Sequence, residues 1–295
     1  MGKDWLVFPQ VWGFDLPDLI RCASETNNVY ICKMQYRITF LGTGTSTGVP
    51  LIGCRCNICT SEDKKDKRLR SSVLVEVLPK NGEVVKILID AGPDFRQQML
   101  THNVTSLDAI LLTHEHWDHV AGLDDVRAFN FLSKRPVPVY AEPRVLKSIK
   151  KDFSYAFTDC PFPGLPEMDL HSIDNGPFAV AGVPIVPVRA LHDKLPVFGF
   201  RIGPFGYLTD ANHIEENELN KYRGVEVFVV STVLKTPHRS HFSLQEAIDV
   251  ARNTGAPNAF LTHMSHRLGP HETFQKELPQ GISPAYDGLV VELQR

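Results

Sequence analysis

The sequence has no hydrophobic run long enough to cross a membrane and no marked excess of charge. The best of its apolar runs, residues 227–230, has the length of a strand, whereas a spanning helix needs about 20 apolar residues. Lys and Arg number 31 against 34 Asp and Glu, which gives a formal net charge of −3. This balance argues against general nucleic-acid binding, which requires a clearly basic surface. We therefore expect a small-molecule partner and no membrane contact.

A disulfide framework and a secretory signal are also missing. Three of the six cysteines crowd into residues 54–59, a spacing unlike that of paired cysteines in a small secreted domain. The N-terminal stretch carries Asp4 where a signal peptide needs uninterrupted apolar residues. We expect a cytoplasmic protein with reduced thiols.

There are no internal repeats, no low-complexity tracts and no linker after Met34. Residues 34–295 are therefore predicted to form one layered α/β domain. Residues 1–33 stand apart as an N-terminal extension, because they carry no strong period and an alternating strand begins at Met34. Two hypotheses stay open for this extension: an artefact that precedes the true start at Met34, or a short segment packed on the domain.

Strands and helices interleave from Met34 onward. Residues 73–77 and 84–89 are predicted to pair as a hairpin across Asn81-Gly82, a strong turn signal. Residues 123–132 are predicted to form one helix. Further strands are expected at 109–112, 137–140, 183–189, 197–202, 207–209, 225–230, 259–261 and 289–293, and further helices at 95–100, 144–153 and 244–253. This mixture is typical of a layered α/β fold.

The strongest chemical signal is the segment Thr113-His114-Glu115-His116-Trp117-Asp118-His119, which follows a predicted buried strand. Histidines at i and i+2 of an extended chain project to the same side, so His114 and His116 can reach one metal ion. Asp118 and His119, adjacent in a turn, can diverge toward a second ion. Divalent ions bind histidine nitrogen and carboxylate oxygen at about 2.0–2.2 Å, and a catalytic site leaves a position open for water. The segment therefore predicts a metal site.

The pattern His-x-His-x-Asp-His resembles that of the metallo-β-lactamase-fold hydrolase superfamily, and the resemblance covers residues 34–295. It implies a four-layer αβ/βα sandwich. It also implies three more ligands at the ends of predicted strands: His192 for the first metal, Asp210 as the bridging acid and His263 for the second. The ligand set implied for two divalent ions is then His114, His116, His192, Asp118, His119, Asp210 and His263.

Asp210 narrows the chemistry that the resemblance implies. The β-lactamase branch has cysteine at this position, whereas aspartate is typical of the phosphodiesterase, nuclease, lactonase and glyoxalase branches. The redox diiron branch has glutamate where this chain has His116, so oxygen chemistry is not expected. Two divalent cations, two aspartates and a bridging hydroxide leave a formal charge of about +1, which suits an anionic substrate and in-line displacement at phosphorus.

A second cluster of metal ligands lies early in the chain. Cys54, Cys56 and Cys59 offer three thiolates, one short of a closed tetrahedral site, and His266 is the expected fourth ligand. These residues, together with the opening segment 40–50, resemble the phosphonate-pathway cyclic ribosyl phosphate phosphodiesterase subfamily. A structural zinc would tie the cysteine loop to the loop that presents His263. Free thiols or a redox sensor are the alternatives.

His241 takes the place in which the family has a general acid, and a histidine is suited to protonate a departing alkoxide. His238 is the alternative, and it is also a candidate for substrate binding. Arg127, one helical turn past the motif, is a candidate contact for a phosphate or a partner for Asp124.

Three other segments leave alternatives open. The glycine-rich loop 42–48 either presents amide groups to a phosphate or forms a tight turn behind the metal site. Asp90 and Asp94 are expected to orient the metal-site histidines. The basic run 64–70 is interpreted as a solvated loop rather than an RNA contact.

The predicted function is hydrolysis of a small, cyclic phosphodiester by a metal-bound hydroxide that Asp118 orients, with His241 as the proton donor. Zinc or manganese is expected at the paired site, and one zinc at the cysteines. The alternatives are a lactone or thioester hydrolase and an endonuclease of the tRNA 3′-processing type. The resemblance also implies a homodimer.

Overall fold

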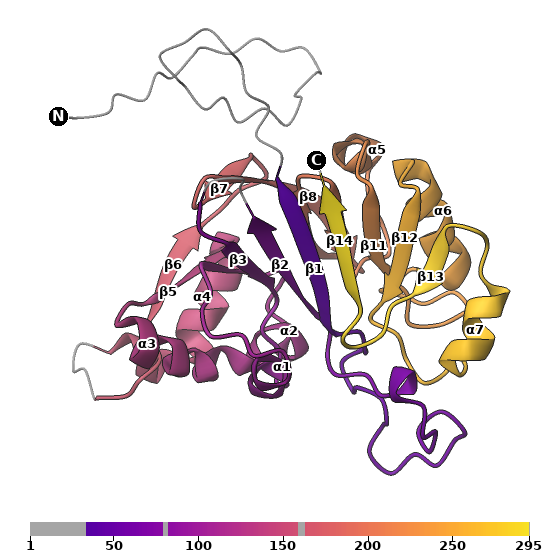
Figure 1. Ribbon diagram of the computed structural model, residues 1–295, viewed down its shortest axis with the longest axis horizontal. Helices are drawn as coiled ribbons and strands as arrows, with labels where there is room; N and C mark the ends of the chain where they lie inside the picture. The colour runs from indigo at the N-terminus through magenta and orange to yellow at the C-terminus, as the bar shows by residue number, and fades with distance from the viewer. Residues whose placement is uncertain (1–33, 79–81, 159–162, 295) are drawn as a thin grey trace, which may run out of the picture.

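The computed structural model describes residues 34–78, 82–158 and 163–294. Within them, two seven-stranded sheets pack face to face, and helices cover the outer face of each sheet (Figure 1). The predicted four-layer α/β sandwich is confirmed. The N-terminal extension, Cys22, Cys32 and Cys160 lie outside the described residues.

The first sheet begins with antiparallel strands and continues with parallel ones. Its central hairpin matches the prediction, although the turn residue Asn81 lies outside the described residues. The strand order is β14 (Val290–Gln294), β1 (Gln35–Gly42), β2 (Ser72–Leu78), β3 (Val85–Ile89), β4 (Ala109–Leu111), β5 (Val137–Ala141) and β6 (Met168–Ser172). The helices of this half are α1 (Phe95–Thr101), α2 (Trp117–Val120), α3 (Arg127–Ser133) and α4 (Pro143–Asp152).

The second sheet has the same plan, with antiparallel strands on one side and parallel strands on the other. Its order is β13 (Ile282–Pro284), β12 (Asn258–Thr262), β11 (Val227–Ser231), β10 (Phe205–Leu208), β9 (Leu195–Ile202), β8 (Val183–His192) and β7 (Phe178–Val180). The helices of this half are α5 (Glu216–Leu219), α6 (Leu244–Thr254) and α7 (His271–Glu277).

Three apolar clusters hold these layers together. The central one lies between the sheets and includes Phe40, Phe198 and Phe200, all fully buried. The other two pack helices on the outer faces, with Phe95 of α1 in the first half and Phe274 of α7 in the second. Burial on this scale fixes the strand ends, and therefore the loops that carry the site.

The predicted helix over 123–132 is wrong in its first half. Residues Ala121–Val126 form a 3-10 helix, and α3 begins only at Arg127. Gly122 lies so close to the preceding loop that a Cβ would stand 2.2 Å from the carbonyl oxygen of Gly92. The Gly122 amide also donates to the Ala91 carbonyl at 2.9 Å. This contact holds the segment against the loop that follows β3 and keeps it in the narrower 3-10 conformation.

None of the helices in the described residues combines the length and the apolar character that crossing a membrane would require.

Candidate metal centre

The polar residues of the motif lie where the parallel strands of both sheets end. His114 follows β4 and Asp90 follows β3, while Asp210 follows β10 and His263 follows β12. Carboxyl ends of parallel strands meet at one edge of a sheet, which is where α/β proteins place their ligands. The packing of the two sheets therefore brings all four residues to one place.

Three of these residues have left-handed backbone conformations. The φ angles are 63° at Asp90, 49° at Asp210 and 55° at His263. Non-glycine residues rarely adopt positive φ, and such strain concentrates at functional sites. Each turn redirects a side chain from the direction of its strand into the space between the halves.

The first cluster consists of His114, His116, His192 and Asp210, whose ligand atoms all lie within 4.8 Å of one another. Oδ2 of Asp210 is 3.9 Å from Nε2 of His114 and 4.0 Å from Nε2 of His192. Two ligands bound tetrahedrally to one ion would stand about 3.4 Å apart, given bonds of about 2.0–2.2 Å. The distances are close to this value.

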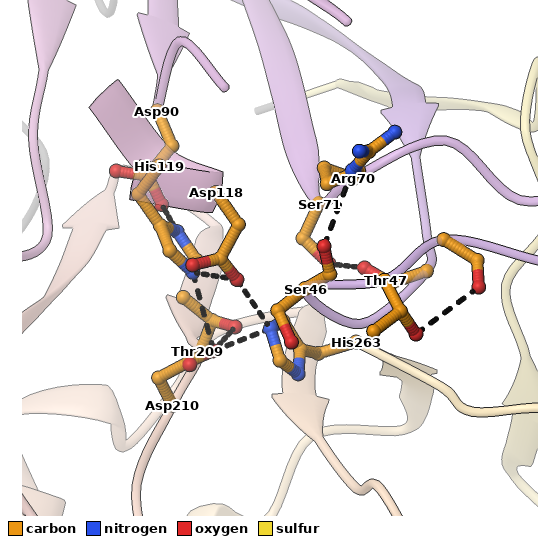
Figure 2. Close-up of polar contacts among 12 residues, drawn as sticks. Ser46, Thr47, Arg70, Ser71, Asp90, Asp118, His119, Thr209, Asp210 and His263 are labelled. Carbon is orange, nitrogen blue, oxygen red and sulfur yellow. Dashed lines mark hydrogen bonds and ion pairs between the residues drawn. The ribbon is translucent and has the colours of Figure 1, made fainter. Parts of the chain in front are cut away.

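The second cluster consists of Asp118, His119, Asp210 and His263. Nε2 of His263 is 3.1 Å from Oδ1 of Asp210 and 3.3 Å from Oδ2 of Asp118. Figure 2 shows these side chains pointing toward one another. Asp210 belongs to both clusters, with Oδ2 toward the first and Oδ1 toward the second.

The rings are held through their other nitrogens. Nδ1 of His119 is 2.7 Å from Oδ2 of Asp90, and Nδ1 of His192 is 2.6 Å from the Ser240 carbonyl oxygen. A carboxylate or carbonyl on one nitrogen fixes the ring and leaves the other nitrogen to bind metal. Asp90 thus orients a histidine, as predicted. Asp94 does not: its carboxylate accepts hydrogen bonds from the backbone amide and side chain of Arg70.

The residues present fit a pair of divalent cations. Nε2 of His114 is buried and has no hydrogen-bond partner among the described residues, and Nε2 of His119 lies 3.2 Å from Oδ2 of Asp118. An unpaired buried polar atom is costly, and a cation in the first cluster would satisfy that of His114. The donor set of imidazole and carboxylate suits zinc or manganese.

The charges around the second cluster favour ionised carboxylates. Burial opposes ionisation of Asp118, but His119 and His263 hold its pKa well below the usual range. Asp210 is likewise buried, and His263 and His119 hold its pKa low. Burial lowers the pKa of His119, but Asp118, Asp90 and Asp210 outweigh it and raise the pKa well above 6.5. Metal binding at His119 would therefore release a proton.

The cysteine cluster has the geometry of a closed site. The Sγ atoms of Cys54, Cys56 and Cys59 lie 3.4, 3.3 and 3.4 Å from Nδ1 of His266. A tetrahedral zinc with bonds of about 2.3 Å to sulfur and about 2.0–2.1 Å to nitrogen would place these atoms about 3.6 Å apart. The four residues that the sequence grouped thus lie around one point.

His241 lies over the junction of the two clusters. Its ring centroid is 4.6 Å from that of His192 and 5.2 Å from that of His263. Burial, opposed by Asp210, lowers the pKa of His241 to about 3, so its ring is neutral at pH 7. His238 is more exposed, and its ring centroid lies 5.1 Å from that of His241.

Arg127 pairs with Asp124, the alternative that the sequence had left open, and its Nε donates to the Asp124 carbonyl at 3.0 Å. Its contact with a substrate stays a prediction, as do the assignments of individual ligands to bound ions.

The solvated-loop interpretation of residues 64–70 is wrong for its buried members. Arg68 is buried and donates to the Ala285 carbonyl at 2.6 Å and to Oγ1 of Thr43 at 2.8 Å. Buried Asp66 accepts the backbone amide of His271 at 2.7 Å, at the start of α7. Two of the charges in this run therefore hold the C-terminal segment in place.

The glycine-rich loop forms a tight turn, in which several backbone amides already donate hydrogen bonds to carbonyl groups of the protein. The Gly44 amide donates to the Leu69 carbonyl, and the Thr45 amide donates to the Met264 carbonyl. Gly42 has no room for a Cβ, which would stand 2.0 Å from the Arg70 carbonyl oxygen. This loop, partly visible in Figure 2 at Ser46 and Thr47, supports the His263 loop from behind.

Sequence reasoning overlooked two supporting groups. Oγ1 of Thr113 is 3.0 Å from Nδ1 of His114 and donates to Asp90, and the Ser240 carbonyl holds His192. Thr113 could have been found from its place directly before the first histidine. The Ser240 contact spans 48 residues, and nothing in the sequence indicates it.

Comparisons with known proteins agree with this geometry. The family described as "Beta-lactamase superfamily domain" matches residues 85–264. The crystal structure of a diphosphatase from the PhnP family has 35% sequence identity and a TM-score of 0.81, covering 89% of this chain and 98% of that one. Zinc-bound PqqB from Methylobacterium extorquens shares the fold, with a TM-score of 0.68 at 18% identity over 87% of this chain and 100% of that one.

Among curated proteins, an octanoyltransferase of Porphyromonas gingivalis is 42% identical over 255 residues, 86% of this chain. The present chain spans about half of that relative, 51% of its length. The fold and the clustered histidines and aspartates are those of a metal-dependent hydrolase. The chain belongs to the metallo-β-lactamase superfamily and lies close to its PhnP family, which confirms the resemblance found in the sequence.

Proposed function

We propose that this chain hydrolyses a small, cyclic phosphodiester at a pair of divalent metal ions, zinc or manganese. The observation that carries the proposal is the position of Asp210, whose two carboxylate oxygens face different clusters of histidines. A carboxylate shared in this way suits two ions a few ångströms apart. Such a pair stabilises both the attacking and the leaving oxygen of a displacement at phosphorus.

The bound ions would supply Lewis acidity and lower the pKa of a water molecule. Ionised Asp118, on the side of the second cluster, can accept a hydrogen bond from that water and orient it. His241 lies beside both clusters and is placed to protonate the departing oxygen. Its ring is neutral in the free chain, so protonation would accompany the arrival of the anionic substrate.

The similarity to a diphosphatase supports cleavage at phosphorus, because diphosphates and phosphodiesters both lose an oxygen leaving group from a negatively charged phosphoryl centre. The octanoyltransferase relative is about twice as long as the aligned region, and acyl transfer gives the competing reaction class. We propose a structural zinc at Cys54, Cys56, Cys59 and His266 in either case.

Turnover of two matched substrate panels tests the proposal. The first holds bis(p-nitrophenyl) phosphate, 2′,3′-cyclic nucleotides and a ribosyl 1,2-cyclic phosphate, and the second holds lactone, thioester and β-lactam substrates. Each panel is measured after loading with zinc or manganese, with Asp118→Asn as the inactive control. A tRNA precursor, added to the first panel, separates the endonuclease alternative.

We expect turnover of the phosphodiesters only, reduced at least about 100-fold by Asp118→Asn. Hydrolysis confined to the carbonyl compounds would overturn the proposal and leave only the fold and the ligand geometry. Circular dichroism of the variant separates a lost function from a lost fold.

A further inference from the structure

The backbone on both sides of His263 is held by other segments of the chain. Two residues before it, the Leu261 carbonyl accepts the backbone amide of Ala285 at 2.9 Å. Directly after it, the Met264 amide donates to the Thr43 carbonyl at 2.9 Å. His263 itself has a φ of 55°, and a non-glycine residue keeps such a conformation only where its surroundings hold it there. These contacts therefore fix the direction in which the His263 ring enters the second cluster.

The two segments that hold His263 are joined to each other by buried side chains. Nη1 of Arg68 donates to the Ala285 carbonyl at 2.6 Å and to Oγ1 of Thr43 at 2.8 Å. The Thr43 hydroxyl donates in turn to Oδ1 of Asp287 at 2.8 Å, and Oδ2 of Asp287 accepts the Leu69 amide at 2.6 Å. We call Thr43, Arg68 and Asp287 the Thr43 network. Because Thr43 and Arg68 are buried, a partner lost from this network leaves a polar group unsatisfied.

The Thr43 network supports one of the two clusters only. The first cluster takes His114 and His116 from the loop after β4 and His192 from the end of β8. In the part of the chain that the structure describes, no hydrogen bond joins the Thr43 network to these three histidines. Loosening the network should therefore move His263 and leave the histidines of the first cluster in place.

We propose that Thr43 and Asp287 are positioning residues for the second metal ion. They act on His263 through the backbone of Met264, and they set the affinity of the second cluster without affecting that of the first. This inference rests on the pair of ions in the proposed function, and it holds for any class of substrate. A metal–ligand bond tolerates a displacement of only about 0.2 Å, so a small shift of the ring weakens binding.

Titration of the full chain with Mn²⁺ tests the inference, after a chelator has removed the ions of the paired site. The electron paramagnetic resonance signal of free Mn²⁺ reports how many ions bind and how tightly. Mn²⁺ prefers oxygen and imidazole to thiolates, so the cysteine cluster does not contribute. The variant His263→Ala identifies which of the two affinities belongs to the second cluster.

The test variants differ by single groups. Thr43→Val keeps the shape of the side chain and loses the hydroxyl, Thr43→Ser keeps the hydroxyl, and Asp287→Asn loses the charge. Thr254→Val is the matched control, because it removes another buried hydroxyl, which donates to the Ala251 carbonyl at 2.7 Å in the last turn of α6. Circular dichroism establishes that each variant is folded, and Asp287→Asn carries the test if Thr43→Val is not.

In the wild type, we expect two Mn²⁺ ions to bind at the paired site. Thr43→Val and Asp287→Asn should each weaken, by about 10-fold or more, the affinity that His263→Ala reduces most, which is the usual effect of losing a group that supports a ligand. The other affinity should not change. Thr43→Ser and Thr254→Val should keep both affinities. The double variant Thr43→Val/Asp287→Asn should lose little more than either single variant, because both changes break one network.

Three results would overturn the inference: unchanged affinities in Thr43→Val and Asp287→Asn, equal weakening of both affinities, or the same loss in Thr254→Val. A wild type that binds a single Mn²⁺ ion would overturn both the proposed pair of ions and this inference. If the wild type binds two ions and cleaves no phosphodiester, the proposed reaction fails, whereas the selective loss in Thr43→Val would still support the positioning role.

Discussion

A histidine ring has two nitrogens, and the centre uses both. Asp90 holds one nitrogen of His119, and the Ser240 carbonyl holds one nitrogen of His192. With a metal ion bound, the held nitrogen would carry the proton and the opposite nitrogen would be free to bind the ion. The spacing of the motif and the family resemblance predict the ligands, whereas the group that holds each ring comes from a distant segment of the chain.

The proposed role of His241 as proton donor gives a prediction about a single residue. We expect His241→Ala to lower kcat for 2′,3′-cyclic nucleotides by about 10²–10⁴-fold, the usual contribution of a general acid. Turnover of bis(p-nitrophenyl) phosphate should change far less, because p-nitrophenolate departs without a proton. Steady-state kinetics on both substrates measures the difference, and His238→Ala is the control. Equal losses on both substrates would contradict a role in proton donation.

At the scale of elements, the candidate site residues could be predicted because they lie at the ends of strands, whereas some of the surrounding elements could not. The motif follows an apolar strand, and the family resemblance implied Asp210 and His263 at the ends of two other predicted strands. The edge strand β6 was missed, since it is only five residues long and its side chains are partly or fully exposed. The 3-10 segment was missed because its cause is the close approach of Gly122 to Gly92, which is a tertiary contact.

The cysteine loop gives a prediction about a single element. Cys59→Ser should lower the zinc content by one ion per chain and the free energy of unfolding by more than about 2 kcal/mol, since loss of a structural metal is among the largest mutational effects. Activity should also fall, because His266 lies three residues after His263. Metal analysis and urea denaturation measure these changes. Asn57→Ala, exposed in the same loop, should change neither.

The start of α7 gives a pH-dependent prediction. Burial and the nearby charges of Arg68 and Lys65 lower the pKa of His271 to about 4. The folded chain therefore binds fewer protons than the unfolded chain between about pH 4 and 6.5, so this residue makes stability fall as pH drops through that range. The contribution is at most about 3.5 kcal/mol, at about 1.4 kcal/mol per pKa unit.

His271→Gln should remove this loss, because an amide oxygen can still accept from Arg68, whose guanidinium lies 3.4 Å from Nδ1, but does not titrate. Urea denaturation at about pH 7 and about pH 4.5 compares the two proteins. The variant should gain stability relative to the wild type at the lower pH. If the difference in unfolding free energy between the two proteins is the same at both pH values, His271 is not the source of the pH dependence.

At the scale of the whole molecule, the first cluster draws ligands from both halves, so the halves must keep their relative position. Arg144 of α4 pairs with Glu115 of the motif, and its Nη2 donates to the Pro196 carbonyl of β9 at 2.6 Å. Arg189 of β8 reaches back to Glu142 at 2.6 Å. The hydrogen bond from Arg144 to Pro196 and the ion pair of Arg189 with Glu142 join the two halves beside the loop that carries His114 and His116.

Arg144→Ala should therefore weaken both the fold and the metal centre. It leaves partly buried Glu115 without its cation, whereas Glu142 keeps Arg189, and the loss should cost about 1–3 kcal/mol of unfolding free energy. Affinity for the first metal should fall about 10-fold or more, as when a group that supports a ligand is lost. Arg37→Ala is the matched control, because it breaks an exposed pair with Glu76 inside the first sheet, and such pairs contribute under about 1 kcal/mol. Urea denaturation and metal titration by calorimetry compare the two variants. If Arg144→Ala matched Arg37→Ala in both measurements, the halves would be held by their apolar core alone, and the ion pairs would have no part in positioning the metal ligands.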